Sequence, residues 1–227
     1  EVTGLQALGE TRPSNKHLAD YLSLGFVPGQ NTLFEGIHQV RPGYYIQLKD
    51  GKASHRAFYS LFDCVKERPS TSTSYDAAKK SLRKLIYKSV EDRLVSDVPL
   101  GCFLSGGIDS SLVVAVAQNL LGSKLKTFSI GFKEAAFNEA SHAAKIAQYL
   151  GCEHREKIFE QKVLLDIFPN YLSMTDQPFG DTSLLPTSLV SQFAREHVTV
   201  ALSGDGGDEG FLGYGMYTWA KRLDSVI

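Results

Sequence analysis

The sequence predicts an α/β protein built on a mostly parallel sheet with helices on both faces. Beyond residue 75, short β-rich runs alternate with stretches of helical periodicity, an order that produces right-handed βαβ crossovers. Two of these runs open directly into glycine-rich loops, at 105–110 and 203–209. A polar, Ser/Thr-rich stretch at 64–74 separates this part from residues 1–63, so we expect two blocks joined by a linker.

Residues 1–63 predict a partial α+β segment. "NKHLADYLSLGF" places apolar side chains near helical spacing and stops at Gly25, while "GYYIQLKDGKASHRAFY" predicts two strands joined by an Asp-Gly turn at 50–51. One helix and one hairpin enclose little core, so this block should belong to a larger domain or pack against the rest. The following linker contains Pro69 and has no apolar periodicity to bury.

The first element of the second block, residues 75–95, is predicted to be a helix with Asp76 near its start, because its apolar side chains share one face. That face consists of Ala78, Leu82, Leu85, Ile86 and Leu94. "VPLGCFL" then predicts a short strand that runs into the first glycine-rich loop, and "SLVVAVAQNLLG" a buried helix that ends at Gly122.

The remaining segments continue the alternation. "KTFSIGF" predicts a strand, and "NEASHAAKIAQYLG" a helix capped by Asn138 and stopped by Gly151. "EHREKIF" predicts a further strand, followed by helical stretches near 161–175 and 182–196. The β-branched run "VTVAL" at 198–202 predicts the strand that opens into the second glycine-rich loop.

Composition excludes several functional classes. The formal charge of the 227 residues is −1, which gives no electrostatic footprint for nucleic acid or a membrane surface. No apolar run approaches the roughly 20 residues that span a bilayer, and the start carries no signal segment, so we expect a cytoplasmic protein. Cys64, Cys102 and Cys152 lack CxxC spacing and are interpreted as buried thiols in a reducing compartment.

The first glycine-rich loop, "SGGIDS" at 105–110, has the features of an anion site. In an open parallel sheet, loops at the carboxyl ends of strands hold ligands, and the helix that follows adds its positive end. Hydroxyl groups of Ser105, Ser110 and Ser111 can donate to phosphate oxygens, and no GxxxxGK[ST] motif occurs anywhere. Asp109 would then bring magnesium to a polyphosphate. Alternatively, the glycines make only a tight turn and Asp109 stabilises the first helical turn.

The second loop, "LSGDGGDEGFLGYG" at 202–215, gathers Asp205, Asp208 and Glu209 beside glycines. Carboxylates this close repel one another unless they are solvated or paired with cations. Facing the first loop, Asp208 could share magnesium with Asp109, and Asp205 could orient an amine or act as a base. The alternative is a solvated acidic turn. The ligand spacing excludes an EF-hand, and the glycine spacing excludes a dinucleotide fingerprint.

Other candidate residues keep two interpretations. Ile130 and Gly131 end a strand and could take an adenine, while Glu139 is a ligand, a cap or a solvated acid. His142 and His154 are interpreted as surface or satisfied histidines rather than catalysts. The aromatic residues Phe211, Tyr214, Tyr217 and Trp219 lie at helical spacing and are predicted to be core.

Four segments taken together resemble a known family: "VPLGCFLSGGIDSS", "FSIGF…FNEASHAAKIAQYLGCEH", "DQPFGDTSLLP" and "VTVALSGDGGDEGFLGY". They are similar to the synthetase domain of glutamine-hydrolysing asparagine synthetases, an ATP-pyrophosphatase domain of the adenine nucleotide alpha hydrolase type. "LADYLSLGFVPGQNTLFEGIHQVRPGYYIQL" resembles the end of that family's glutaminase domain. The resemblance implies a glutaminase part at 1–63, a linker at 64–74 and a synthetase domain at 75–227 that continues beyond the chain.

The resemblance implies an amide-forming ligase whose cofactors are ATP and Mg²⁺. The aspartate side chain would become an aspartyl-adenylate with release of pyrophosphate, and glutamine-derived ammonia would convert it to asparagine. Five residues would bind the pyrophosphate portion: Ser105, Gly106, Gly107, Asp109 and Ser110. Leu104, Ile130, Ser203 and Gly204 would line the nucleotide. Asp109 and Asp208 would hold magnesium, and Asp205 would support formation or use of the adenylate. A homodimer stays open as an assembly state.

Departures from the family pattern leave rivals open. The chain begins with Glu1 where the family's glutaminase has a cysteine nucleophile, and a lysine that the family uses would lie past Ile227. Gly210 and Leu212 replace the Leu and Gly of a DELFGGY pattern, and Asp205 is Glu in many relatives. One rival is a ligase with another acceptor, as in relatives that close β-lactam rings. Another is a non-catalytic nucleotide-binding protein of the same fold.

Overall fold

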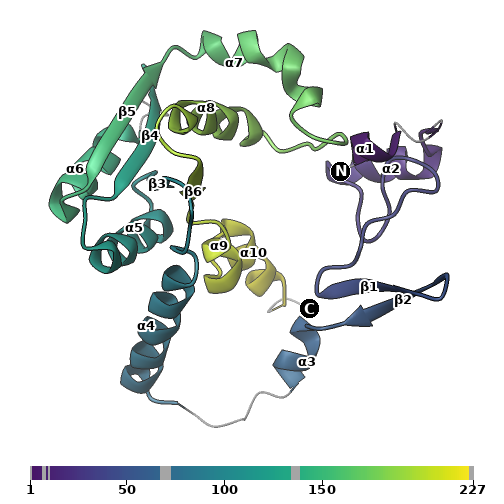
Figure 1. The fold of residues 1–227 in the computed structure, drawn as a ribbon, viewed down its shortest axis with the longest axis horizontal. Coiled ribbons are helices and arrows are strands. Elements are labelled where there is room, and N and C mark those ends of the chain that lie inside the picture. The colour runs from purple at the N-terminus through teal and green to yellow at the C-terminus, as the bar shows by residue number, and fades with distance from the viewer. Residues whose placement is uncertain (1, 7–8, 10, 67–72, 134–138, 225–227) are drawn as a thin grey trace. The chain divides into compact units, whose positions relative to one another are not determined.

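The computed structural model describes residues 2–6, 9, 11–66, 73–133 and 139–224 (Figure 1). The chain divides into two compact units. The first comprises Glu1–Thr73 with Ile167–Ser183, and the second comprises Ser74–Asp166 with Leu184–Ile227. Each unit therefore contains two separate stretches of the chain, which the sequence pattern does not reveal.

The first unit contains the predicted helix and hairpin. Its elements are α1 (Val2–Gln6), α2 (Asn15–Leu24), β1 (Tyr44–Lys49), β2 (Lys52–Ala57), α3 (Leu61–Lys66) and a 3₁₀ helix, η2 (Phe168–Ser173). α2 ends at Gly25, whose positive φ of 79° lets its N–H bond back to the carbonyl of Tyr21. β1 and β2 pair antiparallel across the turn at Asp50 and Gly51, both with positive φ.

Backbone contacts attach residues 167–183 to the first unit. The N–H of Gly180 donates to the carbonyl of Gly25 at 2.6 Å, and a Cβ on Gly180 would lie 3.0 Å from Gly25 Cα. The Gln177 side chain accepts from the Leu33 N–H at 3.0 Å. Because Gly25 and Gly180 meet through their backbones, no apolar pattern in the sequence predicts this contact.

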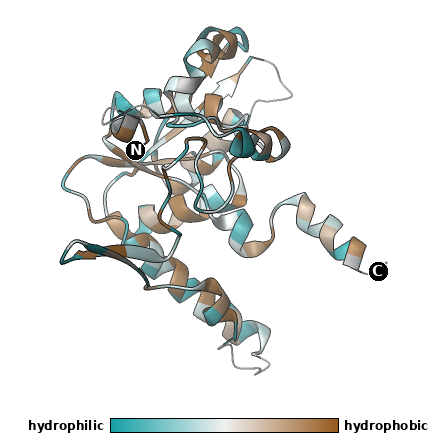
Figure 2. Ribbon diagram, turned by 90° about the vertical axis from the view of Figure 1, so that its right-hand side faces the viewer, coloured by the Kyte–Doolittle hydropathy of each residue, from teal (hydrophilic) through white to brown (hydrophobic). Residues whose placement is uncertain are grey.

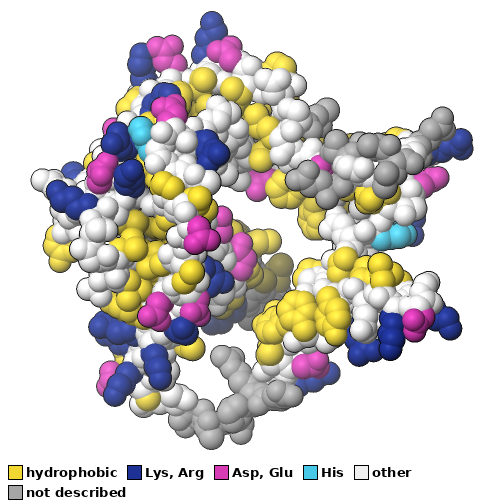
Figure 3. Space-filling model, viewed as in Figure 1, with side chains coloured by type: hydrophobic (Ala, Val, Ile, Leu, Met, Phe, Trp, Pro, Cys, Tyr) yellow, Lys and Arg dark blue, Asp and Glu magenta, His cyan; other side chains and the backbone are white. Residues whose placement is uncertain are grey.

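The first unit encloses little core, as its short elements predict. Val27 and Leu33 are its buried apolar residues among those described, while Leu48, Phe58 and Phe62 are largely exposed. Figure 3 shows hydrophobic side chains gathered on the surface over the hairpin and α3. α3 occupies the start of the predicted linker at 64–74, and Pro69 lies outside the described residues.

The second unit is built on the predicted parallel sheet. Its strands are β3 (Leu100–Phe103), β4 (Lys126–Phe132), β5 (Glu153–Phe159) and β6 (Val200–Leu202), in the order β5-β4-β3-β6 with every pairing parallel. The helices are α4 (Tyr75–Glu91), α5 (Ile108–Leu121), α6 (Ala140–Leu150), α7 (Lys162–Ile167), which runs to the unit boundary, α8 (Leu184–Arg195), α9 (Gly207–Phe211) and α10 (Gly215–Asp224). The predicted α/β fold is confirmed.

Helices cover both faces of this sheet, because successive strand residues point to opposite sides. Cys102 and Leu104 join one core cluster with Val114 and Ala143, which come from α5 and α6. Phe103, between them in sequence, packs instead with the cluster of Phe128 and Ala194, and Ala194 belongs to α8. α5 and α6 therefore cover one face and α8 covers the other.

The predicted apolar face of residues 75–95 is only partly buried. Ile86, Val90 and Leu94 join the core, but Leu82 and Leu85 stay exposed on α4. Periodicity identifies the apolar face of a helix without saying how much of it a neighbour covers. The helix itself begins as predicted, with the Ser74 hydroxyl accepting from the Ala77 N–H.

Two other expectations need correction. Cys64 is exposed rather than buried, although Cys102 is fully buried and its burial raises the pKa of the thiol to about 12. Phe211, Tyr214 and Trp219 are 58%, 43% and 65% exposed, so this aromatic set is not core. Figure 2 shows α10, next to the C-terminus, carrying hydrophobic and hydrophilic residues together. None of the described helices is long and apolar enough to cross a membrane.

His154 is a satisfied histidine, as predicted. Its Nδ1 lies 2.9 Å from the Thr127 hydroxyl and its Nε2 lies 3.2 Å from the Ser129 hydroxyl, both on the neighbouring strand β4. Burial disfavours the charged ring and lowers the pKa of His154, although Glu156 opposes the shift. The neutral imidazole is therefore part of the pairing between β4 and β5.

We predict that the free energy of unfolding falls as the pH drops from about 7.5 to about 5, and falls less in His154→Gln. The unfolded chain binds a proton at the ordinary histidine pKa, the folded chain only at a lower pH, so acid favours unfolding. Urea titrations over this range measure the effect. His55→Gln, an exposed change in β2, is the control. Equal pH dependence in the wild type and His154→Gln would contradict the assignment.

Candidate functional site

Two loops leave the sheet at its carboxyl edge. β3 ends at Phe103 and leads through the first glycine-rich loop into α5, and β6 ends at Leu202 and leads through the second into α9. Since β3 and β6 are adjacent and parallel, both loops lie at one edge, as the sequence predicts. Both loops line one cavity of about 720 Å³, whose wall consists of Phe103, Ser105, Gly107, Ile108, Asp109, Ser110, Thr187, Val190, Ser203, Gly204, Asp205, Gly207, Asp208, Phe211 and Gly213.

Glycines of the second loop allow the two loops to touch. A Cβ on Gly204 would lie 2.7 Å from the backbone nitrogen of Ser110, and one on Gly207 would lie 2.6 Å from Oδ2 of Asp109. A Cβ on Gly213 would overlap the Asp208 carboxylate, and the Gly213 N–H donates to the Asp208 carbonyl at 2.9 Å. Asp109 and Asp208 thus each lie against a glycine of the second loop.

The first loop is held together by its own hydroxyl groups. The Oγ atoms of Ser105 and Ser110 lie 2.9 Å apart, and the Gly107 N–H donates to Ser105 Oγ at 3.2 Å. The Ser111 hydroxyl donates to the Gly107 carbonyl at 2.6 Å. Gly106 has a φ of 87°, and a Cβ there would lie 2.9 Å from the His142 ring. The conformation of the loop is therefore set by its own hydrogen bonds and by its close approach to the start of α6.

The acidic residues of the second loop have different surroundings. Asp205 accepts a hydrogen bond from the Ser203 hydroxyl at 2.8 Å and lines the cavity. Glu209 accepts from the Tyr214 hydroxyl at 2.9 Å; backbone hydrogen bonding, first from its own N–H, and this phenol lower the pKa of Glu209. The same contact raises the pKa of Tyr214. Glu209 is thus engaged by Tyr214, while Asp205 and Asp208 line the cavity.

Asp109 and Asp208 line the same cavity from opposite loops. Among the described residues, no three His, Cys, Asp or Glu side chains converge closely enough to hold a metal by themselves. Magnesium in phosphate-transfer sites takes one or two carboxylates and completes its shell with water and substrate phosphates. Two facing carboxylates beside loops that present N–H and O–H donors fit that chemistry.

A smaller cavity of about 270 Å³ adjoins the large one. It contains Leu104 and Ile130, as predicted for the nucleotide, together with Phe103, Ser105, Phe128, Ser129, Phe132, Glu139, Ala140, Pro186, Thr187 and Val190. Its walls are mainly apolar, and four residues line both cavities: Phe103, Ser105, Thr187 and Val190. Glu139 is at the N-cap position of α6 without a side-chain capping bond, and Asn138 lies outside the described residues.

The predicted site residues are thus largely brought together. The large cavity receives Ser105, Gly107, Asp109, Ser110, Ser203, Gly204, Asp205 and Asp208, and the small one receives Leu104, Ser105 and Ile130. Gly106 shapes the loop through its positive φ. Sequence reasoning missed the α8 residues Pro186, Thr187 and Val190. The sequence signals near them are the segment "DQPFGDTSLLP", which ends at Pro186, and the predicted helix at 182–196, which must cover one face of the sheet.

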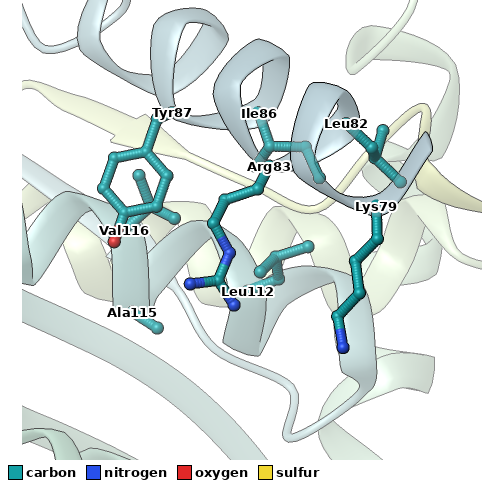
Figure 4. Close-up of a pocket in the computed structure, with 8 residues that line it drawn as sticks. All are labelled: Lys79, Leu82, Arg83, Ile86, Tyr87, Leu112, Ala115 and Val116. Atoms are coloured by element: carbon teal, nitrogen blue, oxygen red, sulfur yellow. The ribbon is translucent and has the colours of Figure 1, made fainter. Parts of the chain in front are cut away.

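A further cavity, of about 330 Å³, lies between α4 and α5 and has different chemistry (Figure 4). Its floor is apolar, with Leu82, Ile86, Leu112, Ala115 and Val116, and Tyr87 completes the wall. The side chains of Lys79 and Arg83 reach from α4 across its mouth. Without a carboxylate or a glycine-rich loop, this cavity does not suit a metal-bound polyphosphate.

Comparison with known proteins decides the family. The family model for asparagine synthase matches residues 81–226. This chain belongs to the asparagine synthase family. The match includes both glycine-rich loops and the strands that carry them, so the resemblance drawn from the motifs is confirmed.

Individual relatives within the asparagine synthase family agree. The chain is 38% identical over 201 residues to asparagine synthetase [glutamine-hydrolyzing] 1 of Bacillus subtilis, covering 88% of this chain and 31% of that protein. It is 36% identical over 233 residues to a Methanocaldococcus jannaschii protein whose name places it in the same group, covering 100% of this chain and 44% of that protein. Amidase chyE of Penicillium rubens is 27% identical, covering 81% of this chain and 30% of that protein. The chain therefore spans less than half the length of these relatives.

Leu212 marks a departure with a structural consequence. Its φ of 59° lies in the left-handed region, at the position where the family pattern has glycine.

We predict that Leu212→Gly stabilises the fold by about 0.5–1 kcal/mol, because relief of the strained backbone outweighs the added chain entropy. Urea unfolding measures it. Leu85→Gly, an exposed change inside α4, should instead destabilise by about 1 kcal/mol. If both changes destabilise the fold, the backbone strain assigned to Leu212 is contradicted.

Proposed function

We propose that this chain carries the ATP-using site of a glutamine-dependent asparagine synthetase. The observation that carries the proposal is the pair Asp109 and Asp208, which line one cavity at the carboxyl edge of a parallel sheet. The adjoining apolar cavity supports it, because adenine needs an apolar slot next to the polyphosphate. The cytoplasm is the proposed location.

In this proposal the two cavities divide ATP between them. Adenine enters the small cavity against Leu104 and Ile130, and the polyphosphate enters the large one. N–H and O–H donors of Ser105, Gly106, Gly107 and Ser110 bind the pyrophosphate portion, and Ser203 and Gly204 form the opposite wall. Asp109 and Asp208 would hold magnesium, which would neutralise the charge of the leaving pyrophosphate.

The reaction proposed here forms two bonds in turn. A carboxylate oxygen of the aspartate substrate attacks the α-phosphorus of ATP, the bond from that phosphorus to its bridging oxygen breaks, and pyrophosphate leaves. Ammonia derived from glutamine then attacks the acyl carbon, AMP leaves with the electron pair of the broken C–O bond, and asparagine forms. Asp205 is the proposed acceptor of the proton that the incoming nitrogen loses, because it is a carboxylate on the cavity wall.

Residues 1–63 are proposed to be the end of a glutaminase domain that supplies the ammonia. The helix and hairpin of the first unit, the exposed apolar surface over them and the "LADYLSLGF…GYYIQL" resemblance support this proposal. A linker at 64–74 and a synthetase domain at 75–227 follow in the same proposal. The boundary between the two units at Thr73 and Ser74 lies within the proposed linker.

A ligase with another carboxylate acceptor is the second candidate. The relative named as an amidase favours it, since that name states amide chemistry without naming asparagine or glutamine. The ATP half of the reaction would stay the same, and the acceptor pocket would differ. A non-catalytic nucleotide-binding protein is less well supported, because Asp109, Asp205 and Asp208 all remain at the cavity.

ATP–pyrophosphate exchange tests the proposed function. Radioactive pyrophosphate should appear in ATP when the full-length protein, magnesium and aspartate are present, because formation of the aspartyl-adenylate is reversible. Exchange that needs a different carboxylic acid would select the second candidate. ATP binding without exchange for any acid tried would favour the non-catalytic alternative.

We predict that Asp109→Ala and Asp208→Ala each abolish magnesium-dependent ATP binding while the unfolding transition stays cooperative. Isothermal titration with ATP, with and without magnesium, measures this loss. Gly207→Ala should weaken the same binding by about tenfold, because the new Cβ displaces the Asp109 carboxylate without removing it.

Gly210→Ala is the matched control in the same helix, since a Cβ at Gly210 meets nothing within 4 Å. It should leave the affinity for magnesium and ATP unchanged. Equal affinity in the wild type and both aspartate variants would exclude these carboxylates as magnesium ligands.

A further inference from the structure

The two cavities of the nucleotide site meet at a short boundary. Phe103, Ser105, Thr187 and Val190 line both, so whatever passes from the small cavity into the large one passes these four side chains. Phe103 and Val190 offer only apolar surface. Ser105 and Thr187 are the two polar side chains at the boundary, and they come from different elements, the first loop and α8.

The hydroxyl groups of the glycine-rich loops have hydrogen-bond partners within their own loops, which a bound phosphate oxygen would replace. Ser105 bonds with Ser110 and with the Gly107 N–H, and Ser111 bonds with the Gly107 carbonyl. In the second loop, Ser203 donates to Asp205. Thr187 differs, because no hydrogen bond to its side chain occurs within the described part of the chain, and the residue is exposed toward the cavities. Its hydroxyl is therefore available to a ligand.

The position of Thr187 favours an anionic ligand group. α8 begins at Leu184 and runs for 12 residues, so Thr187 lies in its first turn. The helix dipole places partial positive charge at the N-terminal end of α8, where Thr187 lies. A phosphate oxygen gains from this environment, whereas a neutral ribose hydroxyl gains little.

We propose that Thr187 binds the α-phosphate of ATP, its hydroxyl donating a hydrogen bond to a non-bridging oxygen. This inference rests on the proposed function: with adenine in the small cavity and the pyrophosphate portion in the large one, the α-phosphate lies at the boundary. The α-phosphorus is the atom attacked in the proposed reaction. Thr187 is thus a catalytic residue on the wall opposite the glycine-rich loops.

Replacing the hydroxyl by a methyl group of similar size tests the proposal. Thr187→Val should lower kcat/KM for ATP in aspartate-dependent pyrophosphate exchange by roughly tenfold to a hundredfold, the usual loss for a hydrogen bond to a charged group. Thr187→Ser, which keeps the hydroxyl, should restore most of the activity. Thr199→Val makes the same change outside both cavities and should behave like the wild type.

Phosphorothioate substrates provide a readout that a purely structural role would not change. Sulfur in place of the oxygen that Thr187 contacts weakens the hydrogen bond, so one diastereomer of ATPαS should be a poorer substrate for the wild type. In Thr187→Val that penalty should shrink, because the hydroxyl donor is already absent. Equal kcat/KM for Thr187→Val and the wild type, an equal loss in Thr187→Ser, or an unchanged preference between the diastereomers would overturn the proposal.

Binding measurements separate this proposal from the proposed function. If the wild type binds magnesium and ATP but shows no exchange with aspartate, the acceptor assignment fails. The role of Thr187 can still be decided, by comparing how tightly the wild type and Thr187→Val bind each ATPαS diastereomer. If Thr187→Val lowers the affinity for ATP but not the affinity for 3′-deoxy-ATP, and does not change the preference between the ATPαS diastereomers, Thr187 contacts the ribose. That result would overturn the α-phosphate assignment. Absence of any ATP binding by the wild type would overturn both proposals.

Discussion

The close approach of two glycine-rich loops is the constraint on which the candidate site depends. β3 and β6 are adjacent parallel strands, so the loops that follow them must leave at the same edge. Glycine at 204 and 207 removes the side chains that would otherwise collide with Ser110 and Asp109. The cavity between the loops, and the position of the Asp109 carboxylate in it, both follow from that contact.

The acidic residues of the two loops differ in their surroundings. Glu209 is hydrogen bonded to Tyr214, and Asp205 accepts from Ser203, so each has a hydrogen-bond partner within the second loop. Asp109 and Asp208 instead line the shared cavity from opposite loops. Two like charges around one cavity repel unless a cation lies between them, and this repulsion is the physical reason for proposing magnesium there.

α8 links the architecture to the site. Its inner surface packs on the sheet through Ala194 beside Phe128, opposite the face that α5 and α6 cover. Its N-terminal part brings Pro186 and Thr187 to the wall of the smaller cavity. In the first unit, the backbone contact between Gly25 and Gly180 joins residues 167–183 to the N-terminal block. The stretch just before α8 is therefore tied to that block, while α8 itself belongs to the sheet.

The sequence by itself determined the alternation of strands and helices, the glycine stops at Gly25, Gly122 and Gly151, and the two loops at one edge, because these depend on local backbone and periodicity. The motifs also sufficed for the family. Only the tertiary structure decided the exposure of the aromatic residues in and before α10, the position of Thr187 in the cavity wall and the hydrogen bond between Tyr214 and Glu209. The physical reason is that burial and cavity walls are set by neighbours distant in the chain, which periodicity cannot specify.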